Sequence, residues 1–123
     1  MTKLKHILFF NEISLDSIDE VGGKNASLGE MYNQLKPMGI AIPNGFALTA
    51  NAYRLFRTEN HLEKKLTDLL AKLDTEEYSN LSDIGKKARL LILSATIPKE
   101  ICEEINILQE SLSMKKYMVR KYQ

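Results

Sequence analysis

The stretch VGGKNASLGEM, residues 21–31, places two glycines and a lysine directly before a pattern with helical spacing. Glycine lets the backbone bend and lets a ligand approach closely, while the start of a helix presents unpaired N–H groups and about half a unit of positive charge. Lys24 adds a full positive charge. This combination is typical of a phosphate site. Taken alone, a Gly-Gly-Lys sequence also fits a plain turn with a solvated lysine, so the surrounding sequence has to decide.

Length and composition indicate a single globular domain. The 123 residues are 44% hydrophobic and 27% charged, which is ordinary for a chain with one core. A formal net charge of +1 gives no general attraction to nucleic acid or acidic membranes, so an anion site has to be local. The single cysteine, Cys102, excludes an internal disulfide and a multi-cysteine metal site. No segment approaches the ~20 apolar residues of a membrane span, and we expect a cytoplasmic protein with no membrane partner.

The hydrophobic pattern predicts an α+β fold, mostly helical, with about five helices and two or three short strands. Pro37 and Gly39 should end the first helix. The turn sequence Pro43-Asn44-Gly45 should lead into a strand. The expected strands are 4–13, 46–48 and a beginning at 117–119, and the expected helices are 25–36, one from 49, one from 60, 80–95 and one from 98 to about 113.

Three helix starts rest on capping residues. Thr49 should cap the second helix, and Asn60 with Glu63 should form a capping box for the third. Ser27 and Glu30 could form another capping box, which would start the first helix a little after the glycines. The sequence leaves open which of the two starts the first helix uses.

The chain offers poor candidates for nucleophilic catalysis. His6 and His61 fit solvated or capping roles, and Cys102 fits a small, mostly buried side chain. Glu103 and Glu104 are the reverse of the electropositive setting that a reactive thiol needs. We therefore predict no catalytic residue and no metal ligand.

A basic cluster stands near the end of the chain at Lys115, Lys116, Arg120 and Lys121. Such a cluster could contact the phosphates of RNA or DNA, but no nucleic-acid motif surrounds it. We expect no nucleic-acid partner.

Two sequence stretches carry a family resemblance. VGGKNASLGEM (residues 21–31) is followed by MGIAIPNGFALT (residues 38–49) and then Ala52-Tyr53, and the spacing between them matches as well. Together they closely resemble the start of the phosphoenolpyruvate synthase and pyruvate, phosphate dikinase family. The likeness covers about residues 5–120, strongly up to residue 55 and afterwards as a helical pattern. It implies that residues 1–123 form the first part of an ATP-grasp nucleotide-binding domain, incomplete at its C-terminal end.

The resemblance also implies a set of ATP contacts. Lys24 matches the lysine that contacts ATP phosphates in the family, and Gly22 and Gly23 would lie beside the nucleotide. Val119-Arg120 matches the first half of a Val-Arg-Ser-Ser strand whose arginine also reaches the phosphates, whereas Lys121-Tyr122-Gln123 departs from that pattern. The implied cofactor and partner is ATP, bound weakly or not at all by this part alone.

The complete family enzyme moves the β-phosphoryl group of ATP to a histidine and then to pyruvate, giving phosphoenolpyruvate, AMP and phosphate. Its Mg²⁺-binding lobe, phosphohistidine domain and pyruvate-binding barrel have no counterpart in these residues. The resemblance therefore implies an ATP-binding fragment without catalysis by itself, and leaves open whether the chain has enzymatic activity. The alternative is a non-catalytic helical interaction module, which would bind the rest of the enzyme or another protein at an unfinished strand edge at 117–119.

Overall fold

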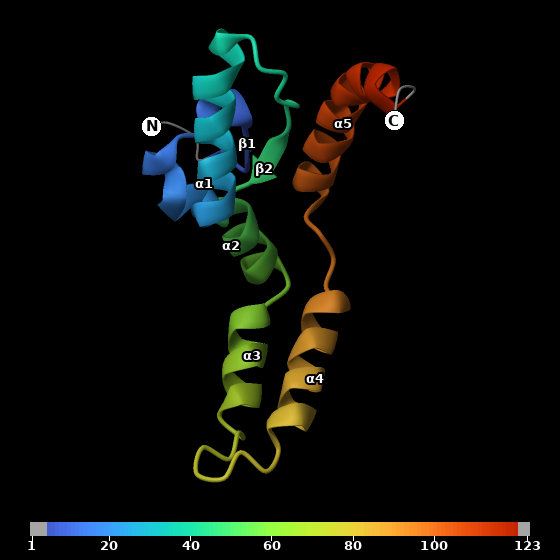
Figure 1. Cartoon of the computed structure of the whole chain (residues 1–123). Coiled ribbons are helices and arrows are strands. Elements are labelled where there is room, and N and C mark those ends of the chain that lie inside the picture. The colour runs from blue at the N-terminus through green and yellow to red at the C-terminus, as the bar shows by residue number, and fades with distance from the viewer. Residues whose placement is uncertain (1–4, 121–123) are drawn as a thin grey trace. The chain divides into compact units, whose positions relative to one another are not determined.

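The computed structural model describes the backbone of residues 5–120 and the side chains of residues 5–112 (Figure 1). Arg54–Pro98 form one compact unit, and the described residues before and after them form a second. The described chain contains five α-helices and one two-stranded antiparallel sheet. This confirms the predicted fold class. The prediction that all 123 residues form one domain stays a prediction.

The sheet joins β1 (Ile7–Phe9) and β2 (Phe46–Leu48), with Leu8 opposite Ala47. The strand at 46–48 is confirmed, but the strand expected over 4–13 is much shorter. Residues 10–12 form a single 3₁₀ turn instead, because the Ile13 N–H donates to the Phe10 carbonyl and the Glu12 carboxylate accepts from the Phe9 N–H. The turn ends the ladder after three residues.

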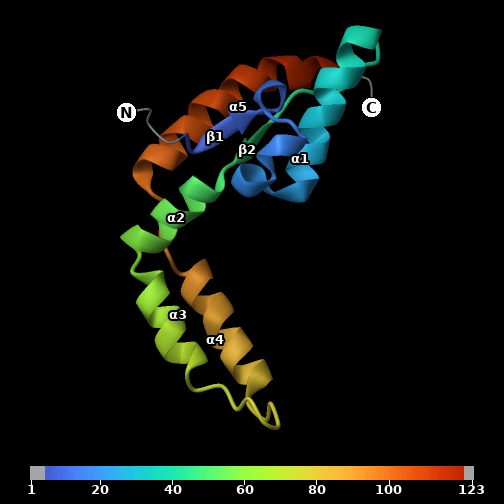
Figure 2. The same cartoon turned by 90° about the vertical axis from the view of Figure 1, so that its left-hand side faces the viewer.

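Helix α1 (Ile18–Leu35) builds the core against this sheet. Figure 2 shows the two strands between α1 and α5. A Cβ on Gly29 would lie 2.6 Å from the Ile13 carbonyl oxygen, so only glycine allows the close approach of α1 to Ile13. The helix ends as predicted, in a 3₁₀ turn and Gly39 at φ 84°. The core residues are Leu8, Ile13, Val21, Ala26 and Ala47.

Helix α2 (Ala50–Glu59) begins in the first unit and ends in the second. Thr49 caps it as predicted, because its buried hydroxyl accepts from the Ala52 N–H at 3.3 Å. The same hydroxyl donates to the Lys5 carbonyl at 2.7 Å. The Thr49 hydroxyl therefore also holds Lys5, just before β1, beside the start of α2.

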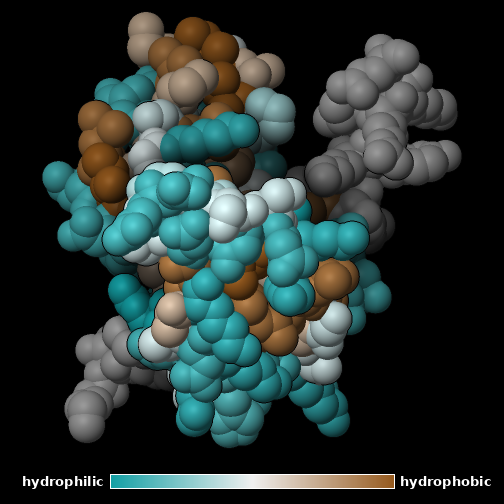
Figure 3. Space-filling view, turned by 90° about the horizontal axis from the view of Figure 1, so that it is seen from below, coloured by the Kyte–Doolittle hydropathy of each residue, from teal (hydrophilic) through white to brown (hydrophobic). Residues whose placement is uncertain are grey.

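The unit Arg54–Pro98 is built around a hairpin of α3 (Leu62–Leu70) and α4 (Leu81–Leu93). Leu62 and Ile84 are buried in it. Other apolar side chains are exposed, including Leu81. Figure 3 shows hydrophobic surface among hydrophilic residues on one face of the molecule.

The predicted capping box of Asn60 and Glu63 is wrong. His61 directly precedes α3, with φ 54°, and Glu63 pairs with Arg57 at 2.9 Å. The Asn60 side chain instead donates to the carbonyl oxygens of Phe56 and Thr96, both at 2.8 Å, and accepts from the Thr96 N–H at 3.0 Å. Asn60 therefore joins the residues just before α3 to those just after α4. This contact with a residue distant in sequence replaces the local cap.

Two predictions about helix α5 (Lys99–Arg120) are wrong. The helix does not end near residue 113, and residues 117–119 are helical rather than a strand. A three-residue strand at this point would need a neighbouring strand, whereas helical hydrogen bonds are made within the segment itself. No helix within the described residues is long and apolar enough to cross a membrane.

Candidate functional site

Gly22 interrupts α1 with a backbone that only glycine adopts readily. Its φ of 81° and ψ of 164° lie outside the helical region and inside a region essentially reserved for glycine. A Cβ at this position would meet nothing within 4 Å, so the requirement for glycine comes from the backbone angles and not from lack of space. The interruption divides α1 into a short turn at 18–21 and a longer helix from Gly23 onward.

This geometry places Gly22 directly before the longer helix and Gly23 at its first residue. The first-turn N–H groups of a helix lack intrahelical acceptors and point away from its N-terminal end. Gly22, Gly23 and Lys24 are all exposed there. The later start is wrong, because Ser27 lies inside the helix and the Glu30 carboxylate instead accepts from the Leu15 N–H and the Gln34 amide.

Lys24 is the one basic residue of α1. Among the described residues no carboxylate forms an ion pair with it. Its ammonium group is therefore available to an anion at the start of the helix, where the helix dipole adds to its charge. Asp19 and Glu20 lie in the preceding turn and are exposed.

Buried neighbours hold the exposed segment in place. Val21 and Ala26 flank it and belong to the core, with Ala26 fully buried. Asn25, half-buried, donates its side-chain amide to the Val21 carbonyl at 3.1 Å, across Gly22. No sequence pattern predicted a role for Asn25. The available signal was an amide side chain placed two residues after a glycine pair.

Residues 18–121 match the family described as "Pyruvate phosphate dikinase, AMP/ATP-binding domain". The chain belongs to this family. The match contains Gly22, Gly23 and Lys24 and extends over both compact units.

The chain is similar to the N-terminal region of curated phosphoenolpyruvate synthases. It is 42% identical over 100 residues to the phosphoenolpyruvate synthase of Neisseria meningitidis, and 47% identical over 95 residues to that of Synechocystis, which is 81% and 77% of this chain. A third, from Helicobacter pylori, is 36% identical over 115 residues, or 94% of this chain. The matches cover 12–14% of the relatives' own length.

The remaining predicted contact, Arg120, is the last residue of α5. Its side chain lies outside the described residues, and the strand expected around it is a helix. Its contact with nucleotide stays a prediction. Residues 5–112 contain no group of three His, Cys, Asp or Glu side chains arranged to hold a metal ion. The phosphate contacts of Gly22, Gly23 and Lys24 likewise stay predictions.

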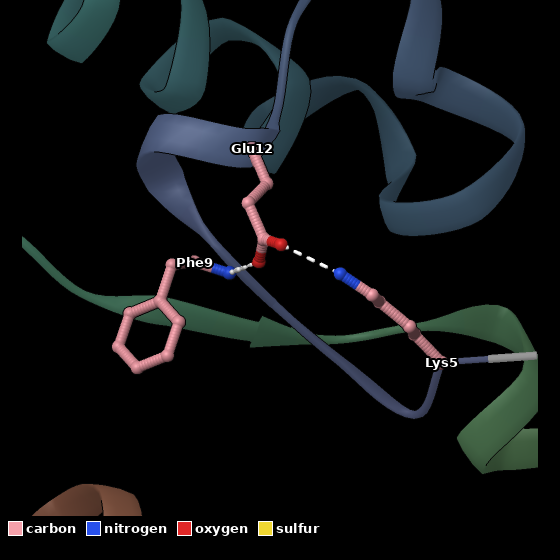
Figure 4. Close-up of polar contacts among 3 residues, drawn as sticks. All are labelled: Lys5, Phe9 and Glu12. Atoms are coloured by element: carbon pink, nitrogen blue, oxygen red, sulfur yellow. Dashed lines mark hydrogen bonds and ion pairs between the residues drawn. The ribbon is translucent and has the colours of Figure 1, made fainter.

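A separate hollow of about 360 Å³ lies beside β1 and is lined by Lys5, Ile7, Phe9, Glu12, Glu104, Ile107 and Leu108. Figure 4 shows its polar contacts: the Lys5 ammonium donates to Glu12 at 2.7 Å, and the Phe9 N–H donates to the same carboxylate at 2.9 Å. These bonds, the Lys5 bond first, lower the pKa of Glu12. Lys5 and Glu12 are paired with each other, so this contact stabilises the 3₁₀ turn.

Proposed function

We propose that this chain binds the phosphates of ATP through the backbone of Gly22 and Gly23 and the ammonium of Lys24. The observation that carries the proposal is the glycine-only backbone of Gly22, which starts a helix beside a lysine without an ion pair among the described residues. Membership of a family described as an AMP/ATP-binding domain supplies the class of ligand.

The chemistry of the segment suits a polyphosphate. Backbone N–H groups donate to phosphate oxygens without a side chain in the way, because Gly22 and Gly23 have no Cβ. Lys24 is a compact charge on a flexible stem, and it can follow the terminal phosphates as they are positioned. Mg²⁺ bound with ATP would neutralise part of the phosphate charge.

The wider reaction is proposed from the relatives' name. Phosphoenolpyruvate synthases make phosphoenolpyruvate from ATP, pyruvate and water, and this chain would contribute phosphate positioning to that reaction. It supplies no predicted catalytic residue, and we expect no phosphoryl transfer by these 123 residues alone. Arg120 is proposed as a second phosphate contact, which an Arg120→Ala variant would test.

The test is a titration followed by ¹⁵N–¹H NMR, which detects weak binding residue by residue. Addition of MgATP to the native chain should shift the amide signals of Gly22, Gly23 and Lys24. Lys24→Ala should weaken the affinity about tenfold, the loss expected when a charged hydrogen-bond donor to phosphate is removed. Lys64→Ala is the matched control, because Lys64 is an exposed lysine paired with Asp68 in the other unit.

Two results would overturn the proposal. One is the absence of any response at Gly22–Lys24 up to several millimolar MgATP. The other is an equal affinity in the native chain, Lys24→Ala and Lys64→Ala, since general charge would then explain the binding. Turnover of ATP and pyruvate by the purified chain would contradict the positioning role.

The alternative of an interaction module rested on a strand edge at residues 117–119 and on the apolar surface that a missing partner would leave. That segment is helical, so the edge that motivated the alternative does not exist. Sizing the purified chain by light scattering checks what is left of the idea: a stable oligomer would support it, and a monomer at high concentration would not.

A further inference from the structure

One side-chain hydrogen bond spans the glycine-only residue of the phosphate segment. The Asn25 amide nitrogen donates to the Val21 carbonyl at 3.1 Å, which joins the turn before Gly22 to the helix after it. Asn25 is half-buried, and Val21 belongs to the core. The bond therefore links the helix after Gly22 to a core residue before it.

Between the core residues Val21 and Ala26, the Asn25 bond is the side-chain contact that spans this segment. Gly22 and Gly23 are exposed, and the space where each Cβ would stand is open to at least 4 Å. Within residues 5–112, residues 21–24 receive no other side-chain hydrogen bond. Because glycine adopts many other backbone angles as readily as these, a contact across Gly22 helps to select this conformation.

We propose that Asn25 is the positioning residue that holds the phosphate-binding backbone in its active shape. This inference rests on the proposed function, because it assigns Asn25 the task of keeping the N–H groups of Gly23 and Lys24 directed at the phosphates. The task needs a neutral donor. An amide supplies one, whereas an ionised carboxylate of the same shape only accepts hydrogen bonds and would repel phosphate.

The experiment compares Asn25→Ala and Asn25→Asp with Asn33→Ala as the matched control. Asn33 is an asparagine of the same helix that also donates to backbone carbonyls, those of Phe10 and Ile13, but eight residues further along. Two quantities are measured: amide hydrogen exchange at Gly22, Gly23 and Lys24, and the affinity for tripolyphosphate, which contains the phosphates without the nucleoside.

Asn25→Ala should raise amide exchange at the three residues and weaken tripolyphosphate binding, each about fivefold, the factor that corresponds to one ordinary hydrogen bond. Asn25→Asp should bind at least as weakly. Asn33→Ala should lower the denaturation midpoint without changing amide exchange at Gly22–Lys24 or the affinity for tripolyphosphate. If Asn25 had a purely structural role, all three variants would change these two quantities alike.

The outcomes separate this inference from the proposed function. If the native chain responds and Lys24→Ala weakens binding, but Asn25→Ala matches the native chain in exchange and affinity, only the role of Asn25 is overturned. If the native chain shows no phosphate response, both proposals are overturned. A loss of affinity in Asn33→Ala as large as in Asn25→Ala would show that general destabilisation, and not positioning, explains the effect.

Discussion

The two compact units use unusual backbone angles in different ways. In the hairpin unit, His61 and Tyr78 have φ values of 54° and 56°, and both lie in turns next to side chains that hydrogen-bond across the turn. Near Tyr78, the Asp74 carboxylate accepts from Ser79 and from the Glu76 and Glu77 N–H groups. In the other unit, Gly22, Gly23 and Lys24 are exposed where the longer part of α1 begins.

The difference separates a turn that serves the fold from one suited to a ligand. The Asp74 carboxylate occupies N–H groups of its turn, whereas the Asn25 amide that spans Gly22 donates to a carbonyl, and Lys24 forms no ion pair among the described residues. The predictions below test this contrast, beginning with the variant that should lose most stability.

Gly29→Ala should cause the greatest loss of stability. The added methyl group would overlap the Ile13 side chain and carbonyl, and Ile13 is fully buried. Overpacking of this kind costs about 1–3 kcal/mol, and the backbone contact places it at the upper end. Urea unfolding followed by circular dichroism measures the change. A variant as stable as the native chain would show that α1 can move away from Ile13 freely.

Gly22→Ala should lose phosphate binding with a smaller loss of stability. No atom blocks the new methyl group, but the backbone region costs a non-glycine residue about 1–3 kcal/mol, which a shift of the exposed segment can relieve. That shift would move the N–H groups away from the ligand. The NMR titration with MgATP measures the loss.

Gly39→Ala is the control for Gly22→Ala. Gly39 also has a positive φ, 84°, with open space around it, but it lies after the other end of α1. Alanine there should cost about 1 kcal/mol and leave MgATP binding unchanged. Equal binding losses in both variants would contradict a specific role for Gly22.

Asn60→Ala should weaken the closed end of the hairpin. It removes three hydrogen bonds and leaves Thr96 without its partner, for which we expect a loss of about 1–2 kcal/mol. Hydrogen exchange should rise within Arg54–Pro98 and stay unchanged at Gly22–Lys24. A rise in both places would contradict the division into separate units.

These elements also show what sequence could predict. The pattern VGGKNASLGEM predicted a helix beside a glycine pair, because glycine geometry and helical spacing are local properties. Thr49 was predicted for the same reason. The contact of Lys24 with phosphate stays a prediction. Asn60 was misassigned because its partner, Thr96, is 36 residues away. The end of α5 was misplaced because a strand needs a partner that local sequence does not reveal. The Asn25 contact needed the backbone angles of Gly22.

The smallest predicted effect concerns Glu12 and pH. Its pKa lies below the ordinary value of 4.5 because the folded chain supplies hydrogen bonds from Lys5 and then from Phe9. Between the lowered pKa and the ordinary one, the unfolded chain binds more protons than the folded chain, so stability falls as pH falls through this range. The contribution is present in full above the ordinary pKa. Because the pair is largely solvated, we expect only a few tenths of a kcal/mol.

Glu12→Gln isolates this contribution. The glutamine keeps the size of the side chain and removes its titration, so the difference in unfolding free energy between the two chains should shrink as the pH falls from 6 to 3. Urea unfolding at several pH values measures that difference. A difference that stays constant would mean that the folded chain does not stabilise the ionised carboxylate, and that the 3₁₀ turn is held by its backbone bonds alone. The effect should leave the phosphate response at Gly22–Lys24 unchanged at pH 7, because Glu12 acts on the end of β1 and not on the start of the helix.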